Sequence, residues 1–224
     1  MSVTITISEQ SLPRIEYQNA NGLKRGFFVH HDQLIGFLQS ATNDRDIEDH
    51  GSPLMVTPAL PPNCVKYAFL SNDSHALFVT APEISVNVKY HATEFENVPF
   101  PKLVFAFIVR NEILTKAYVA VYKDLFLRDN TKLYHFPYSN VYTDGQLCYW
   151  SNEKFKDLVQ LQTFHHRWVQ EPNSDHLFRQ SLTTLNKPLR ELFDISQNKP
   201  FDYSILTPME ITFNQWSYQV ISKQ

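Results

Sequence analysis

Glycine and cysteine are scarce in this sequence, and both shortages carry information. Five of the 224 residues are glycine, and Gly145 is the single glycine after Gly51. Glycine reaches left-handed backbone angles at little steric cost, so its use in a stretch that otherwise avoids it predicts a turn that other residues form poorly. The two cysteines, Cys64 and Cys148, are too few for a zinc site without histidine partners, and a disulfide between them is not expected in a reducing cytoplasm.

Long charged runs and long apolar runs are also missing. The net charge is -3 and no extended basic run occurs, which argues against nucleic acid or an anionic membrane as the main partner. The longest strictly apolar run, residues 103–109, is far shorter than a membrane-spanning helix. The first four residues lack the basic start and apolar core of a signal peptide. We therefore expect a cytoplasmic protein with no membrane or nucleic-acid partner.

Apolar residues, by contrast, are plentiful. Hydrophobic residues make up 43% of the chain and aromatic residues 14%, which is ample for a buried core. Alternating or continuous apolar segments predict strands, and apolar residues spaced three and four apart predict helices. The predicted strands are residues 3–7, 14–17, 26–30, 65–70, 76–80, 84–90, 103–109 and 115–122. The predicted helices are residues 31–39, 153–164 with Asn152 as cap, an apolar stripe over 177–185, and 189–193; residues 205–220 receive no assignment.

The order of these elements predicts an α+β fold. Strands in the region 65–122 favour an antiparallel β-meander with one face covered, with a hairpin turn at residues 110–113, and the segments after Cys148 are helical. A polar stretch and a proline-bearing connector separate a β-rich N-terminal extension, residues 1–60, from a domain of residues 61–224.

Residues 137–148 place a turn between two chemically useful side chains. Asp144-Gly145 predicts a tight turn, so Asn140 and Cys148 fall on opposite arms of a short loop. A cysteine thiolate is a strong nucleophile that can carry an acyl group as a thioester. Attack on that thioester builds negative charge on the carbonyl oxygen, and an amide donor aimed at this oxygen lowers the barrier by roughly 3–4 kcal/mol. The pattern favours acyl-transfer chemistry at Cys148.

This loop resembles the active-site loop of ubiquitin-conjugating enzymes, whose signature places Asn eight residues, and Gly three residues, before the catalytic Cys. The resemblance is closer to the bacterial family D of conjugating-enzyme-like proteins, the protein B family of PRTRC gene cassettes. That family's pattern is Pro-aromatic-x-Asn-Val-Tyr-x-x-Gly-x-hydrophobic-Cys. The matching residues are Pro137, Tyr138, Asn140, Val141, Tyr142, Gly145, Leu147 and Cys148. With weaker similarity in the flanks, including Phe164-His165, the resemblance covers roughly residues 60–210.

The resemblance implies a ubiquitin-conjugating-enzyme-like fold and a transferase that needs no cofactor. A ThiF-like activating enzyme would adenylate a ubiquitin-like modifier protein and pass it to Cys148 as a thioester, with Asn140 stabilising the oxyanion. The acyl group would then move to an amine, and a JAB-type metalloprotease of the same pathway would reverse the link. Tyr138-Ser139 stands where the eukaryotic signature has His-Pro, so other contacts must hold the loop.

Each residue of the loop also has a simpler interpretation. Cys148 can be a buried apolar thiol, as we expect for Cys64, and Asn140 can be a turn residue bonded to its own backbone. Asp144 is expected to form the turn; the alternative is an acid that deprotonates an incoming lysine. Tyr142 is expected to pack beneath the loop.

The histidines after the loop leave two alternatives open. His165 or His166 could act as a base, since histidine titrates in the useful range, or both could be packing and surface residues. Neighbouring residues of a helix point about 100° apart, so at most one of them faces Cys148. His30-His31 and His91 lack the spaced partners that a metal site requires.

Two other functions remain possible from the sequence. A non-catalytic binding module would keep the fold and dock a modifier or an activating enzyme, without using Cys148. A cysteine hydrolase would pair Cys148 with His165 or His166 and use Asn140 as oxyanion donor.

Overall fold

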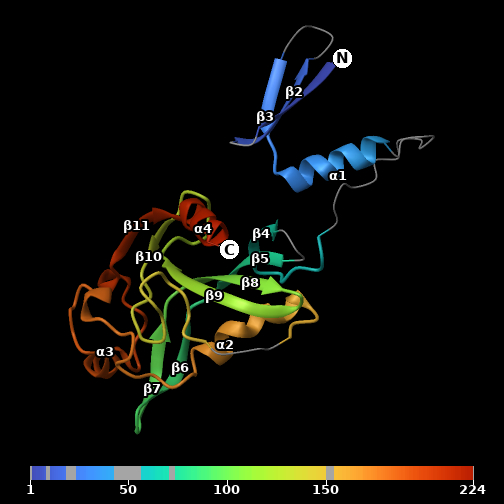
Figure 1. Ribbon diagram of the computed structural model, residues 1–224. Helices are drawn as coiled ribbons and strands as arrows, with labels where there is room; N and C mark the ends of the chain where they lie inside the picture. Colours follow the sequence, from blue (N-terminus) through green and yellow to red (C-terminus); the bar gives the residue numbers. More distant parts are fainter. Residues whose placement is uncertain are drawn as a thin grey trace. The chain divides into compact units, whose positions relative to one another are not determined.

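A computed structural model describes residues 2–8, 11–18, 24–42, 57–70, 74–149 and 154–223 (Figure 1). Its contacts divide the chain into two compact units, Met1–Val56 and Thr57–Gln224. The division into an N-terminal extension of residues 1–60 and a domain of residues 61–224 stays a prediction.

The first unit contains a small antiparallel sheet and one helix. Strands β1 (Ser2–Ser8), β2 (Ser11–Gln18) and β3 (Lys24–Phe28) pair in sequence order, and helix α1 (His31–Thr42) follows. The predicted strands and helix of this region are confirmed; a turn at residues 19–22, which the Asn- and Gly-containing sequence there also predicts, lies outside the described residues. Ile15 of β2 and Leu34 of α1 are buried, and the two elements contact each other.

The second unit is built on a six-stranded antiparallel sheet of order β11-β10-β9-β8-β5-β4. The strands are β4 (Cys64–Leu70), β5 (Ser74–Ala81), β8 (Leu103–Arg110), β9 (Ile113–Tyr122), β10 (Lys132–Tyr134) and β11 (Pro208–Thr212). A separate hairpin, β6 (Ile84–Tyr90) with β7 (Thr93–Phe100), is inserted between β5 and β8. The five predicted strands are confirmed, whereas β7, β10 and β11 were not predicted. The mixed α/β content with mostly antiparallel strands agrees with the α+β expectation.

The sheet is covered on both faces, so the expectation of one covered face is wrong. Strand β8 is buried at every position except Arg110. On one face Phe105 packs edge-on against Phe164 and Trp168. On the other face Ala106 belongs to a core cluster with Trp216. A continuous apolar run, without alternation, is typical of a strand buried on both faces.

The C-terminal helices differ from the prediction in two places. In place of a helix over 153–164, a 3₁₀ helix (Leu158–Thr163) capped by Asp157 leads into a short α2 (Phe164–Trp168), and Asn152 lies outside the described residues. The stripe over 177–185 forms only one 3₁₀ turn, Gln180–Leu182.

Two further helices complete the second unit. Helix α3 (Leu189–Ser196) confirms its prediction, and α4 (Phe213–Ser222) occupies the unassigned segment. Across the described ranges, no helix combines the length and apolarity needed to cross a bilayer.

Candidate functional site

Residues 140–148 form a hairpin closed by the predicted turn. The Tyr142 N–H donates to the Gln146 carbonyl at 2.8 Å, and the Gly145 N–H donates to the Tyr142 carbonyl at 3.0 Å. Asp144 Oδ1 accepts the Gln146 N–H at 3.1 Å, which makes Asp144 the turn-forming residue as expected. Its Oδ2 lies 3.5 Å from Lys223 Nζ.

Gly145 is required at the turn for two reasons. Its φ is +86°, in the region that side-chain-bearing residues rarely adopt. A Cβ at this position would lie 3.2 Å from the Val119 carbonyl oxygen. The close approach of the Gly145 backbone to Val119 permits a hydrogen bond, in which the Val119 N–H donates to the Gly145 carbonyl at 2.9 Å. The scarce glycine therefore permits both the turn and its attachment to β9.

The second arm of the hairpin continues the sheet beyond β10. Strand β10 pairs with β9 only at Val121 and Tyr122. Further along the same edge of β9, the Leu147 N–H donates to the Ala117 carbonyl at 2.8 Å, and Gln146 is bridged to Tyr118. The central sheet thus fixes the arm that ends in Cys148.

Asn140 and Cys148 oppose each other across the two arms. Val141 and Leu147 form an antiparallel bridge and are both buried, so the next pair outward is Asn140 with Cys148. The Cys148 N–H donates to the Asn140 carbonyl at 2.8 Å. The structure thus brings together the two residues that the sequence singled out.

The Asn140 side chain is oriented by a segment that the sequence did not identify. Its Nδ2 donates to the Pro172 carbonyl at 3.1 Å, and its backbone has a left-handed φ of 68°, which Asn tolerates. An amide NH₂ group carries two donors, so a second N–H is not committed by this bond. No periodicity or motif in the sequence marks Pro172 as a neighbour of Asn140.

Buried contacts beneath the hairpin hold the segment that leads into it. Tyr138 is buried among aromatic rings, and its hydroxyl donates to the Pro99 carbonyl at 2.9 Å; burial raises the pKa of this phenol. The Ser139 hydroxyl donates to Asn173 Oδ1 at 2.7 Å, and both residues are buried. Asn173 in turn pairs through its backbone with Lys89 of β6. Asn173 is a second contact that the sequence did not indicate.

The Cys148 sulfur is partly exposed and lies near a phenol. The Tyr142 hydroxyl lies 4.0 Å from Cys148 Sγ and donates toward it. Tyr142 is 41% exposed, so the expectation that it packs beneath the loop is wrong. The hydrogen bond to Cys148, and then the charge of its thiolate, raise the pKa of Tyr142. The hairpin therefore carries Asn140, Tyr142 and Cys148 close together on its outer surface.

The histidines are not bonded to the sulfur. His165 is 6% exposed, and burial, together with the adjacent His166 ring, lowers its pKa to about 4. Its Nε2 has no hydrogen-bond partner, and the His166 ring centroid lies 4.0 Å from its own. Within the described residues, Cys148 makes no hydrogen bond with either histidine. His165 is a neutral buried ring at pH 7.

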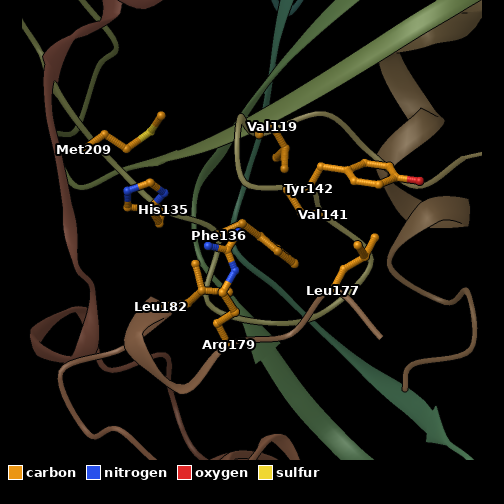
Figure 2. A pocket seen from close by; sticks show the side chains of 10 residues that line it. Val119, His135, Phe136, Val141, Tyr142, Leu177, Arg179, Leu182 and Met209 are labelled. Atoms are coloured by element: carbon orange, nitrogen blue, oxygen red, sulfur yellow. The ribbon is translucent and has the colours of Figure 1, made fainter. Parts of the chain in front are cut away.

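A small cavity lies beside the hairpin (Figure 2). Its volume of about 10 Å³ is the space of roughly one water molecule. Figure 2 shows the Tyr142 phenol extending away from His135 and Met209, which line the opposite side of the cavity. Burial and the nearby Arg179 charge lower the pKa of His135. The cavity does not include Cys148 and is too small to hold a substrate. Its lining residues are Val119, His135, Phe136, Val141, Tyr142, Gly145, Leu177, Arg179, Leu182 and Met209.

Comparison with known protein families finds a match. The sequence profile described as prokaryotic E2 family D matches residues 51–209, which include the whole hairpin. The chain belongs to prokaryotic E2 family D. This E2-like membership, predicted from the loop, implies a conjugating-enzyme-like role and a ubiquitin-like protein as the general kind of partner. No curated protein and no solved structure matches the chain.

Proposed function

We propose that this E2-like chain is a transferase that carries a ubiquitin-like protein as a thioester on Cys148. The observation that supports it is the opposition of Asn140 and Cys148 across one hairpin, with the Cys148 N–H bonded to the Asn140 carbonyl at 2.8 Å. A partly exposed thiol at this position is open to a macromolecular acyl donor. The attached sheet keeps the two side chains in register.

The first step is an exchange of thioesters. The Cys148 thiolate attacks the carbonyl carbon of the modifier's thioester on a ThiF-like activating enzyme. A new C–S bond forms to Cys148, the C–S bond to the activating enzyme breaks, and the enzyme's thiolate leaves. The exchange needs no base at the sulfur once the thiolate has formed.

Asn140 stabilises the charge that develops in each transfer. With one N–H held by the Pro172 carbonyl, the second N–H is free to donate to the oxyanion. One such donor accounts for roughly 3–4 kcal/mol of barrier lowering. An amide supplies it without a change of protonation state.

The second step passes the acyl group to an amine. The neutral amine attacks the carbonyl carbon, the C–S bond to Cys148 breaks, and the amine nitrogen loses its proton to solvent or a nearby carboxylate. The Tyr142 hydroxyl, 4.0 Å from Sγ, donates to the leaving thiolate. A JAB-type metalloprotease that reverses the link, a PRTRC cassette context and a cytoplasmic location belong to the same proposal.

Transfer is favoured over hydrolysis by the surroundings of the sulfur. A cysteine hydrolase pairs its thiol with a base within hydrogen-bond reach. Among the described residues the hydrogen-bond partner of Sγ is the Tyr142 hydroxyl, while His165 is buried and its pKa, lowered to about 4, makes it a weak base.

The test is a thioester assay with the full chain, an activating enzyme, ATP and the modifier. We expect an adduct that dithiothreitol removes, present in the wild type and in Cys64→Ala, and absent in Cys148→Ala. Cys64 is the matched control, because it is the other free thiol of the chain. A non-catalytic binding module would form no adduct in any of the three proteins.

A further inference from the structure

A lysine amine lies at the turn of the hairpin that ends in Cys148. Lys223 Nζ is 3.5 Å from Asp144 Oδ2, and the other oxygen of the same carboxylate accepts the Gln146 N–H at 3.1 Å. The turn therefore orients the carboxylate, and the carboxylate holds the amine. Cys148 follows Asp144 by four positions, which limits the distance between them to about 13 Å at most.

The core of the second unit fixes the position of this lysine. Lys223 follows the last turn of α4, and Trp216 and Val220 of that helix are buried in the core cluster that also contains Tyr118. Tyr118 of β9 is the bridge partner of Gln146 in the hairpin. Helix α4 and the hairpin thus meet at the same strand, which brings Lys223 to Asp144.

The amine is both accessible and loosely held. The Lys223 side chain is 50% exposed and that of Asp144 42% exposed. Exposed ion pairs of this kind are weak, so Nζ leaves Asp144 readily. Lys66, by contrast, is bonded to Asn214 and Ser217 of α4. The long flexible stem of Lys223 allows its amine to sweep over the hairpin surface.

We infer that Lys223 is an acceptor site for the acyl group carried by Cys148, so that the chain modifies itself. This inference rests on the proposed function, because it requires a thioester on Cys148. Lys223 first gives its ammonium proton to water; the neutral amine then attacks the thioester carbonyl, a C–N bond forms and the C–S bond breaks. The Cys148 thiolate leaves, and the amine's proton passes to the Asp144 carboxylate or to water. The product is an amide on Lys223 that thiols do not cleave.

A synthetic acyl donor tests the inference without the protein modifier. The full chain is incubated at pH 7 with a fluorescent glycyl-glycine dipeptide supplied as its mercaptoethanesulfonate thioester. Adducts are then mapped by peptide mass spectrometry before and after dithiothreitol. We expect a thiol-sensitive adduct on Cys148, followed by a thiol-resistant adduct on Lys223 that falls at least tenfold in Cys148→Ala.

Two lysine variants make the test specific. Lys223→Arg keeps a cation beside Asp144. This variant should lose the thiol-resistant adduct, while Cys148 still acquires the thiol-sensitive acyl group. Lys187→Arg is the matched control, because Lys187 is a similarly exposed lysine paired with Glu191 at 2.8 Å, and it should leave the Lys223 adduct unchanged.

The outcomes separate this inference from the function on which it rests. Two outcomes overturn the inference alone. In the first, Cys148 carries the acyl group but no amide forms on Lys223. In the second, the amide on Lys223 is equally abundant in Cys148→Ala. A wild-type chain that never forms the thiol-sensitive adduct on Cys148 overturns both.

Discussion

The backbone N–H of Cys148 donates to the carbonyl of Asn140 at 2.8 Å, which makes the two residues a cross-strand pair. The eight-residue spacing between Asn140 and Cys148 therefore reflects the pairing register of the two arms of the hairpin. With Val141 bridged to Leu147, the residue that opposes Cys148 is the one eight positions before it. A shift of one residue would turn Cys148 toward the buried face, because side chains alternate along each arm.

The amide of Asn140 is expected to matter more than its backbone. Asn140→Gly preserves the left-handed φ of 68° and removes the side-chain donor. We expect transfer from the Cys148 thioester to an amine to slow by about 100- to 1,000-fold, as for loss of one oxyanion donor. Single-turnover discharge to free lysine measures this rate. Asn111→Gly, at another left-handed Asn in the turn between β8 and β9, should discharge at the wild-type rate. An unchanged rate in Asn140→Gly would remove Asn140 from the mechanism.

Gly145→Ala is expected to destabilise the second unit by about 1–2 kcal/mol, because alanine resists the left-handed φ and its Cβ crowds the Val119 carbonyl at 3.2 Å. Urea unfolding followed by tryptophan fluorescence measures the loss; residues 168 and 216 are tryptophans of this unit. Gly36→Ala is the control, since nothing lies within 4 Å of its Cβ position in α1, and it should not lower this transition. Equal stability of Gly145→Ala and wild type would contradict the description of the turn.

The Tyr142 hydroxyl is expected to stabilise the Cys148 thiolate. Tyr142→Phe removes the donor 4.0 Å from Sγ and keeps the ring. We expect iodoacetamide to alkylate Cys148 about threefold more slowly at pH 7, a modest effect because the pair is exposed. Peptide mass spectrometry resolves Cys148 from Cys64. Tyr218→Phe, an exposed tyrosine on α4, serves as control. Faster alkylation in Tyr142→Phe would reverse the assigned role.

His165 is expected to make stability depend on pH in mildly acidic solution. Its pKa is lowered from 6.5 to about 4, mainly by burial. Between these values the unfolded chain binds a proton that the folded chain does not. The contribution is therefore fully present above pH 6.5 and is lost as the pH falls toward 4. With allowance for solvent screening, we expect about 1–2 kcal/mol.

Urea midpoints at pH 7 and pH 4.5 test this slope. His165→Gln should flatten the difference between the two midpoints, whatever its effect at either pH alone. His176→Gln changes an exposed histidine and should keep the wild-type difference. A wild-type slope that persists in His165→Gln would place the titrating group elsewhere.

The sequence predicted the hairpin because its determinants are local. A glycine after a turn-forming Asp, and an Asn and a Cys at fixed spacing, define the register without reference to the rest of the chain. The supports of the hairpin are not local. Pro172 and Asn173 reach Asn140 and Ser139 through tertiary packing, and their own sequence carries no sign of it.

The prediction of helices after the hairpin failed for a related reason. Apolar spacing over 153–164 and 177–185 resembles an amphipathic helix, but residues 158–163 and 180–182 form 3₁₀ helices. Tertiary context overrides helix propensity in such segments. The sequence of helix α4, in contrast, contains features that are typical of a helix. Thr212 and Gln215 form a capping box, and Phe213, Trp216 and Val220 share one face.

The most direct test of the account is intact-mass measurement of the full chain after reaction with the activating enzyme, ATP and the modifier. The account predicts one added modifier, released by dithiothreitol, in the wild type and in Cys64→Ala. It predicts no such species in Cys148→Ala. A thiol-sensitive adduct that persists in Cys148→Ala, or none in the wild type, would contradict it.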